Sequence, residues 1–488
     1  MGDQLGRKAI NGAAWKFAER ILAQGITTIV GIILARLLEP EHYGIIAIVN
    51  VFISICNVFV VSGFPESLIQ KKDADDVDFT TIFYLNLSIS LTLYAFLFFA
   101  APAITRFYGK EYKQLTPIIR IMGLRLLLAS INAIQHAKIA RELAFKKYFY
   151  VTLVGTLISA FVGIVLAYSG FGVWALVAQY MTNTTIDTIM LFVFVRWIPR
   201  SKFSVSRVKT LGGYGIRLLF TALITTIINE LEQLLIGKRY SSEDLAFYSK
   251  GKTYPKLLVQ NISTAISSAI FPLLSKVQDD KAKTKYYASK SIKLISFAVF
   301  PCVIGLAAVA NDFVKVLLTD KWLPCVPYLV IMCFINAIDP IVVTNSQCLT
   351  AQGNSKLYAR ITISMRAFGV VLLIITLRFG VLWIAFGRLF RIIVEYIVKT
   401  VPTKKIINYG LFEQLYDMLP NLIGCGLMFA SVKLVSNFYS GSSSLISLIL
   451  QVAAGAMVYI VYSCITKNSE MQYCLNIISR GRLGKRNG

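Results

Sequence analysis

Basic residues lie deep inside segments of this chain that are otherwise apolar. A charged side chain in the middle of a bilayer costs several kcal/mol unless it faces water or a partner, so each one is a candidate for function. A guanidinium group stays charged and binds two phosphate oxygens at once through its planar fork. We therefore expect an anionic substrate to be bound by these basic and polar residues: Arg20, Gln24, Arg125, Arg217, Asn229, Arg366 and Arg388.

Two of the apolar segments carry polar residues at every fourth position, which places them on one face of a helix. The first stripe is Lys16, Arg20, Gln24 and Thr28, and the second is Arg217, Thr221, Thr225 and Asn229. Glu232 falls on the face next to the second stripe. The two stripes predict a shared polar cavity, lined by Asn, Gln, Thr and aromatic side chains as well as by the basic residues.

Carboxylates in the apolar segments are fewer, and three are candidates for coupling transport to an ion gradient: Asp339, Asp187 and Glu232. Binding of H⁺ or Na⁺ to such a group can bias the equilibrium between two conformations. The alternative for each carboxylate is a structural salt bridge to a neighbouring arginine. Apart from such a coupling ion, we expect no cofactor.

Some of the basic residues have a purely structural alternative. Lys16 and Arg217 lie near the ends of their segments, where a long side chain can extend to the lipid headgroups. Arg391 and Glu395 are four residues apart and can form a local ion pair on one helix.

The composition is that of a polytopic membrane protein. Of the 488 residues, 56% are hydrophobic and only 15% are charged, against about 25% charged in an average soluble domain. The net charge of +25 comes from short basic clusters between long apolar runs, which is typical of cytoplasmic loops. This pattern excludes a soluble enzyme and a nucleic-acid-binding domain.

Neither a disulfide framework nor a metal site is indicated by the eight scattered cysteines, which include no Cys-x-x-Cys pair, and the two histidines. The polar and basic start leads into a long apolar segment without a small-residue cleavage site. We interpret this segment as a retained first helix.

A window of about 20 residues, the length that spans a bilayer, predicts about fourteen transmembrane helices, or twelve if a weak late hairpin is misread. Lys and Arg are several times more abundant in one set of alternate loops, which places both termini in the cytoplasm. The predicted spans are 12–37, 44–69, 79–104, 116–137, 149–168, 173–195, 213–236, 247–273, 290–317, 326–349, 358–377, 380–398, 419–436 and 445–466.

Three short motifs recur in order at a spacing of roughly 205 residues, the mark of a duplicated transporter. The clearest is Phe64-Pro65 followed by Lys71 and two aspartates, which recurs from Phe271-Pro272. A shift of six spans preserves orientation, so the repeats are parallel. We expect two six-helix lobes, at 1–198 and 199–403, followed by two further helices and a basic cytoplasmic tail at 404–488.

Several motifs resemble the polysaccharide transporters, or O-antigen flippases, of the multidrug/oligosaccharidyl-lipid/polysaccharide exporter superfamily. They are the runs 35–44, 63–72 and 170–177, and the stretch from Leu235 to Ser275. The resemblance implies that superfamily's all-α fold. It also implies a flippase that carries undecaprenyl-pyrophosphate-linked oligosaccharide across the bacterial cytoplasmic (inner) membrane by alternating access. A monomer within the membrane lipid, with a polysaccharide polymerase and glycosyltransferases as candidate partners, is expected.

Two other functions compete with this one. A multidrug exporter of the same superfamily would favour acidic and aromatic groups in its cavity, whereas deep arginines outnumber deep carboxylates here. A polysaccharide polymerase or membrane glycosyltransferase would need a long loop or a catalytic domain, and every predicted connector is short. The aspartates between Asp73 and Asp78 could mimic a metal site, but a solvated loop is the expected structure, and no enzymatic activity is expected.

Overall fold

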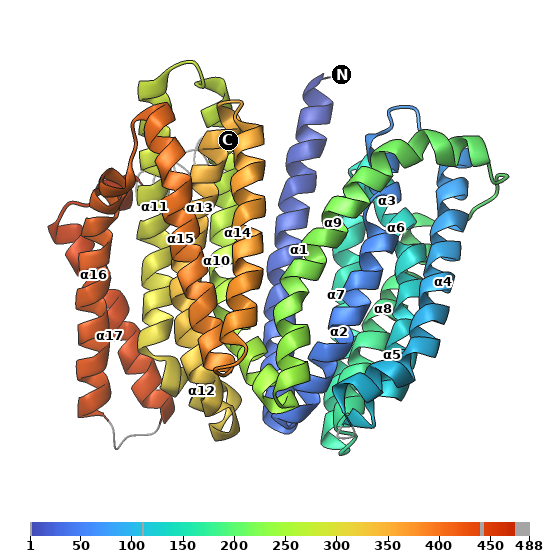
Figure 1. Ribbon diagram of the computed structural model, residues 1–488, viewed down its shortest axis with the longest axis horizontal. Helices are drawn as coiled ribbons and strands as arrows, with labels where there is room; N and C mark the ends of the chain where they lie inside the picture. The colour runs from blue at the N-terminus through green and yellow to red at the C-terminus, as the bar shows by residue number, and fades with distance from the viewer. Residues whose placement is uncertain (1, 110–111, 440–443, 474–488) are drawn as a thin grey trace. The chain divides into compact units, whose positions relative to one another are not determined.

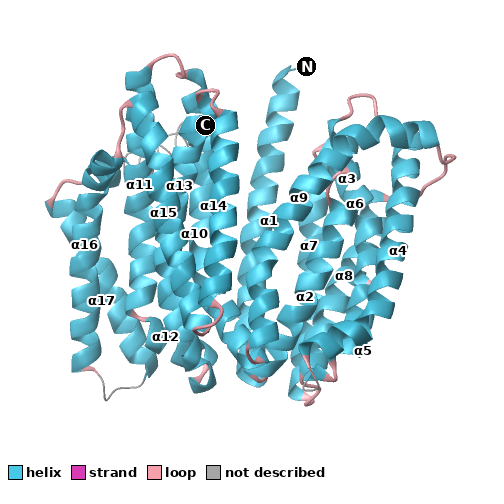
Figure 2. Ribbon diagram, in the orientation of Figure 1, coloured by secondary structure: helices cyan, strands magenta, loops and turns pink. Residues whose placement is uncertain are grey.

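The computed structural model describes residues 2–109, 112–439 and 444–473, and within these ranges every regular element is a helix (Figures 1 and 2). The chain divides into two compact units, Met1–Ala246 and Phe247–Gly488. Within each unit the long helices run side by side (Figure 1). The expected all-α fold is confirmed.

The first unit contains nine helices in its described part. They are α1 (Gly2–Leu37), α2 (Pro40–Val61), α3 (Phe64–Gln70), α4 (Asp76–Tyr108), α5 (Leu115–Gly123), α6 (Arg125–Glu142), α7 (Phe145–Tyr168), α8 (Val173–Val195) and α9 (Val205–Arg239). Helix α9 packs against α2, α3 and α4.

The second unit takes most of α10 (Ser242–Lys276), whose first residues belong to the first unit. Its other elements are α11 (Lys281–Ala308), α12 (Ala310–Leu318), the 3₁₀ helix η2 (Asp320–Cys325), α13 (Val326–Ala351), α14 (Ser355–Thr376), α15 (Val381–Ile407), α16 (Leu411–Phe438) and α17 (Ser444–Ile465). The sequence repeat predicts lobe boundaries at 198 and 403. These boundaries describe an internal symmetry rather than compact units, and they stay a prediction.

Each of the fourteen predicted spans overlaps a helix. Among the described residues, 12 helical segments are long and apolar enough to cross a membrane. The two others, α8 and α15, have the length but carry polar and charged residues in their middle. The expected count of about fourteen is therefore consistent with the structure, and α8 and α15 are singled out as helices that place polar groups inside the bilayer.

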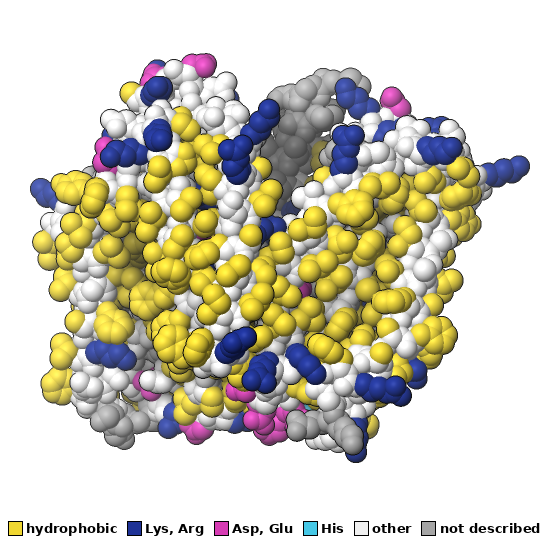
Figure 3. Space-filling model, in the orientation of Figure 1, with side chains coloured by type: hydrophobic (Ala, Val, Ile, Leu, Met, Phe, Trp, Pro, Cys, Tyr) yellow, Lys and Arg dark blue, Asp and Glu magenta, His cyan; other side chains and the backbone are white. Residues whose placement is uncertain are grey.

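The outward surface of the helices is apolar. On the face shown in Figure 3, hydrophobic side chains cover the middle of each unit, and Lys and Arg gather toward its two ends. Large aromatic side chains are exposed on the helices, with Phe99 of α4 77% and Phe412 of α16 84% exposed. Such a surface is stable only in lipid, so the chain is a multi-pass membrane protein.

Glycines let the helices of the first unit approach closely. A Cβ atom on Gly44 of α2 would lie 1.8 Å from the carbonyl oxygen of Ser242. A Cβ atom on Gly63, where φ is +97° at the break between α2 and α3, would lie 2.6 Å from the carbonyl oxygen of Gly215 in α9. Both positions require glycine, because any side chain would force the backbones apart.

Buried amide side chains fasten α16 to the rest of the second unit. Asn345 of α13 and Gln414 of α16 exchange two hydrogen bonds, of 3.0 and 2.9 Å. Asn421 of α16 donates to the hydroxyl of Ser296 in α11 at 2.8 Å. Such bonds are strong in an apolar interior, so α16 is held firmly against α11 and α13.

The repeated motif has the same local role in both units. The carboxylate of Asp75 caps α4 by accepting from the backbone N–H of Asp78 at 2.9 Å, and that of Asp280 caps α11 by accepting from the N–H of Lys283 at 3.0 Å. These backbone hydrogen bonds are the main reason that the pKa of each capping aspartate lies below its usual value. The two copies of the motif therefore begin a helix in the same way.

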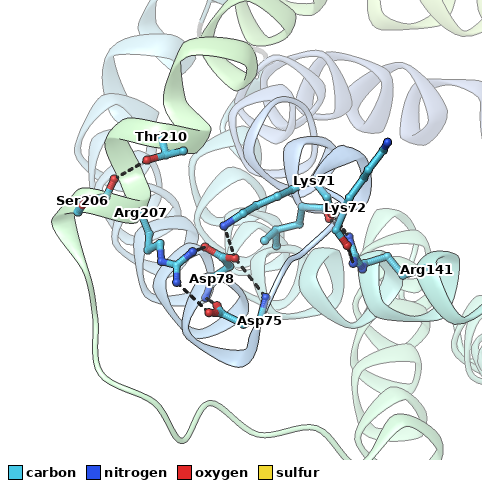
Figure 4. Close-up of polar contacts among 9 residues, drawn as sticks. Lys71, Lys72, Asp75, Asp78, Arg141, Ser206, Arg207 and Thr210 are labelled. Carbon is cyan, nitrogen blue, oxygen red and sulfur yellow. Dashed lines mark hydrogen bonds and ion pairs between the residues drawn. The ribbon is translucent and has the colours of Figure 1, made fainter.

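The two copies differ at the third residue after the cap, where the first unit has a buried aspartate (Figure 4). Asp78 is 0% exposed. Its carboxylate pairs with Lys71 at 2.5 Å and with Arg207, at the start of α9, at 3.4 Å. Arg207 also pairs with Asp75 at 2.8 Å. The expectation of a solvated loop is wrong for Asp78, because two basic partners compensate its burial.

The connector between α8 and α9 is tied to the same turn. Asp76 accepts hydrogen bonds from the indole of Trp197 at 2.7 Å and the hydroxyl of Ser201 at 3.1 Å. Gln135 of α6 donates to the backbone carbonyl of Trp197 at 2.9 Å. Arg141 donates to the carbonyls of Leu68, Lys71 and Lys72 (Figure 4). The acidic loop is thus an anchor for the start of α9.

Replacing Gly44 with alanine should destabilise the first unit by about 1–3 kcal/mol, because the added methyl group overlaps the backbone of Ser242. The measurement is thermal unfolding of the full chain in detergent. Gly31→Ala in α1 is the matched control, since no atom lies within 4 Å of its Cβ position. Equal stability of the two variants would contradict the close approach of α2.

Asp78→Asn should lower stability by about 1–3 kcal/mol, because a neutral amide leaves Lys71 and Arg207 without their shared partner. Both cations are partly exposed and can be hydrated in the variant, which limits the loss of stability. Thermal unfolding would test this, with Asp73→Asn in the exposed part of the same loop as the control. A loss of the same size in both variants would show that the effect is one of net charge.

Candidate functional site

The predicted site residues divide between the two units. In the first unit, Arg20 and Gln24 lie on α1, Arg125 on α6, Asp187 on α8, and Arg217, Asn229 and Glu232 on α9. In the second unit, Asp339 lies on α13, Arg366 on α14 and Arg388 on α15. The cavity that both groups were expected to share stays a prediction.

Arg125 is the first residue of α6, directly after the break at Leu124 that separates α5 from α6. Its Nε donates to the hydroxyl of Thr184 at 3.1 Å, and its guanidinium lies over the ring of Tyr180, 5.0 Å from the centroid. Within the described part of the chain, no hydrogen-bond partner occupies its Nη atoms. Arg125 is thus oriented by α8 while the outer edge of its fork stays available to an acceptor.

Asp187 lies one turn further along α8, against Gly155 of α7. A Cβ atom on Gly155 would lie 2.2 Å from Asp187 Oδ1, so only glycine leaves room for this carboxylate. Asp187 Oδ1 is buried and accepts no hydrogen bond from the described residues. Glu19 of α1 is close enough to Asp187 to interact with it electrostatically. Tyr148 of α7 interacts electrostatically with both of these carboxylates.

Glu19 was missed from the sequence. It directly precedes Arg20, a residue of the polar stripe on α1, and this position is the sequence feature that could have identified it. The structure brings it near Asp187, more than 160 residues away. Two carboxylates from α1 and α8 and a tyrosine from α7 therefore form one acidic cluster.

The remaining residues of the two predicted stripes differ in exposure. Arg20 and Gln24 are partly buried on α1, and Lys16 lies over the ring of Phe145 in α7, 5.4 Å from its centroid. Arg217 and Asn229 are exposed on α9. The contact of Lys16 with α7 is intramolecular, so extension to lipid headgroups is not needed to account for this residue.

Glu232 is half-buried on α9, and the neighbouring Glu230 accepts a hydrogen bond from Gln233 at 2.7 Å. A coupling role for Glu232 stays a prediction.

Helix α15 carries a charged row that we call the α15 ladder: Arg388, Arg391, Glu395 and Lys399. Glu395 pairs with Arg391 at 2.5 Å and with Lys399 at 2.8 Å, one helical turn to either side. The expected ion pair between Arg391 and Glu395 is confirmed. Glu395 is 8% exposed and Lys399 4% as whole residues, so these two members of the triad are buried, whereas Arg391 is only partly buried.

The predicted span 380–398 ends just before Lys399 and so places this residue in a loop. That assignment is wrong, since α15 continues to Ile407. The signal was the spacing of four residues after Glu395, which continues the same helical face. The ammonium group also lies over the ring of Tyr358 in α14, 5.5 Å from its centroid.

Two neighbouring helices contribute to the surroundings of the ladder. Asp339 of α13 is exposed, and Arg388 is the strongest of its basic electrostatic neighbours. Arg366 of α14 is partly buried. Gly369 of α14 gives room to Arg391, whose Cδ would lie 2.6 Å from a Cβ atom there. The structure therefore collects charged groups from α13 and α15 in one region.

A metal centre is not indicated, because no group of three or more His, Cys, Asp or Glu side chains in the described ranges could hold an ion. The chemistry available is instead the binding of anions by Arg and Lys, and proton or cation exchange at isolated carboxylates.

Comparisons with known proteins agree with the resemblance seen in the sequence. The lipopolysaccharide biosynthesis protein WzxC of Escherichia coli (strain K12) is 22% identical over 336 residues, 68% of this chain and 68% of WzxC. The succinoglycan biosynthesis transport protein ExoT of Rhizobium meliloti (strain 1021) is 23% identical over 309 residues. That match covers 63% of this chain and 62% of ExoT, so it spans less than two thirds of the relative.

The fold is shared with a solved structure described as the lipid II flippase MurJ in an inward closed conformation. The TM-score is 0.73 at 16% identity, over 94% of this chain and 98% of MurJ. The model of the polysaccharide biosynthesis protein family matches residues 33–327, more than half of the sequence. The chain therefore belongs to the polysaccharide biosynthesis protein family.

Proposed function

We propose that this protein is a flippase for an anionic polyprenyl-(pyro)phosphate-linked oligosaccharide. The observation that carries the proposal is the presence of basic groups, partly buried at Arg125 in α6 and partly to fully buried along the ladder in α15, inside helices whose outer faces are apolar. Basic groups at such positions are candidates for function, and guanidinium groups suit a diphosphate. Family membership and the names of WzxC and ExoT support export of a surface polysaccharide.

The substrate would move from the cytoplasmic to the outer leaflet of the bacterial inner membrane. Both termini and the basic loops would lie in the cytoplasm, as the distribution of Lys and Arg favours. Alternating access of the two units would expose the basic groups first to one side and then to the other. The product would be the precursor of O-antigen, capsule, exopolysaccharide or teichuronic acid, and the activity is transport rather than catalysis.

A multidrug exporter of the same fold is the second candidate, and the charges of the second unit argue against it. A cationic drug needs carboxylates that are not already neutralised. Glu395 is occupied by two cations, and Asp339 has Arg388 as its strongest basic neighbour. The excess of positive charge in the second unit suits an anionic cargo.

For the coupling ion we propose a proton bound at Asp187. An ionised carboxylate with a buried oxygen that accepts no hydrogen bond is costly, and a second carboxylate on α1 adds repulsion. Protonation removes both costs. Because the cluster joins α1, α7 and α8, its protonation state would bias how these helices pack.

In proteoliposomes, Arg125→Ala should abolish flipping of a fluorescent polyprenyl-pyrophosphate-linked oligosaccharide, because the diphosphate loses a bidentate donor. Arg125→Lys should restore it only in part. The matched control is Arg120→Ala in α5, since Arg120 also donates through Nε, to the carbonyl of Phe98 at 3.2 Å, and stacks on the ring of Phe98. Wild-type activity of Arg125→Ala would contradict its role, and no flipping by the wild type would contradict the proposed function.

Asp187→Asn should make flipping insensitive to an imposed pH gradient, because the amide cannot exchange a proton. The initial rate with and without a gradient is the measurement. Asp339→Asn is the comparison at the other candidate carboxylate and should keep its response. A gradient response that survives in Asp187→Asn and disappears in Asp339→Asn would move the coupling site to α13.

A further inference from the structure

We propose that Glu395 is a resident competitor for the diphosphate of the substrate. In the empty carrier it neutralises Arg391 and Lys399, and on loading it yields Arg391 to the incoming phosphate oxygens. The inference deepens the proposed function and rests on it, since it concerns how an anionic headgroup is first held and then released.

The geometry of the α15 ladder suits this exchange. Glu395 has a cation one helical turn before it and another one turn after it, at 2.5 and 2.8 Å. A bridging carboxylate in this position uses both of its oxygens, one for each cation. An arriving diphosphate offers oxygens of the same kind, which can replace one of these contacts without leaving a buried cation alone.

The three side chains of the triad differ in how accessible they are. Their exposed fractions are 25% for Arg391, 11% for Glu395 and 5% for Lys399. Arg391 is therefore the most accessible member of the triad, and Lys399 is the one that would keep Glu395 in place during the exchange. Gly369 of α14 leaves the space in which the Arg391 side chain lies.

The charges of the region leave an excess that favours an anion. Arg388, Arg391 and Lys399 face two carboxylates, Glu395 and Asp339. One positive charge is therefore left over among these five groups. The guanidinium fork of Arg391 can bind a phosphate through two parallel hydrogen bonds. When a phosphate replaces Glu395, Arg391 therefore gains a bidentate contact as well as a strongly charged partner.

A competitor of this kind serves release as much as binding. Without Glu395, the three cations would face Asp339 alone and would hold a diphosphate too tightly to let it go. A tethered carboxylate lowers the affinity by a fixed amount, because the substrate must displace it, and it re-pairs with Arg391 when the substrate leaves. Removing the carboxylate of Glu395 would also leave Arg391 and Lys399 without the partner they share. A variant that lacks this carboxylate should therefore bind a mobile anion more tightly.

The test is binding of inorganic pyrophosphate to the full-length protein in nanodiscs, measured by calorimetry. Glu395→Gln should bind pyrophosphate at least about tenfold more tightly than the wild type. In proteoliposomes, the same variant should flip the lipid-linked oligosaccharide more slowly, because release becomes limiting. Arg391→Leu in the Glu395→Gln background should remove the gain in affinity.

Two further variants keep the test decisive. Glu413→Gln is the matched control, because it removes a carboxylate of α16 that pairs at 2.5 Å with Lys285 of α11, in the same unit but outside the ladder. Its affinity for pyrophosphate should equal that of the wild type. If Glu395→Gln fails to fold, Glu395→Asp keeps the charge but shortens the reach to both cations, and it should bind pyrophosphate more tightly than the wild type.

Unchanged affinity in folded Glu395→Gln, or an equal gain in Glu413→Gln, would overturn the inference and make the triad a structural brace of α15. Either result would leave the proposed function standing if the wild type flips the lipid-linked oligosaccharide. A wild type that binds pyrophosphate as described but flips no such lipid would instead contradict the proposed function.

Discussion

The cost of placing a charge inside an apolar helical bundle governs this structure. An uncompensated charge there costs several kcal/mol, and the charges described above meet that cost in two ways. Asp78 and Glu395 each pair with two cations, and Arg125 is held by a hydroxyl and an aromatic face. Asp187 Oδ1 accepts no hydrogen bond from the described residues, and this observation is the basis of the proton exchange that we propose there.

The same constraint separates structural charges from functional ones. The group around Asp78 joins α4 and α9 at a helix start, where its basic partners reach solvent, and it fastens the connector before α9. The ladder lies within one helix, so its ion pairs fasten no second helix to α15. Glycine contacts in the first unit and amide pairs in the second already supply close packing. Charges that packing does not require are the ones that a substrate can use.

Much of the fold could be predicted from the sequence, because span length and apolar composition depend on the bilayer alone. The positions of the helices, the family and the Arg391–Glu395 pair followed from local patterns. Contacts between distant segments could not be predicted, since a single sequence carries no sign of which helix faces meet. The proximity of Glu19 to Asp187 and the partners of Asp78 are of this kind. Lys399 was misplaced because the apolar window ended before the helix did.

The central claim is that basic groups inside the helices receive the diphosphate of a lipid-linked oligosaccharide. An experimental structure of the protein with that lipid bound, in nanodiscs, tests it most directly. We expect density for the diphosphate within hydrogen-bond distance of Arg125 or Arg391, well inside the hydrocarbon region. Density for the diphosphate only at the level of the lipid headgroups, with the Arg391–Glu395–Lys399 triad intact and Arg125 still bound to Thr184 alone, would contradict it.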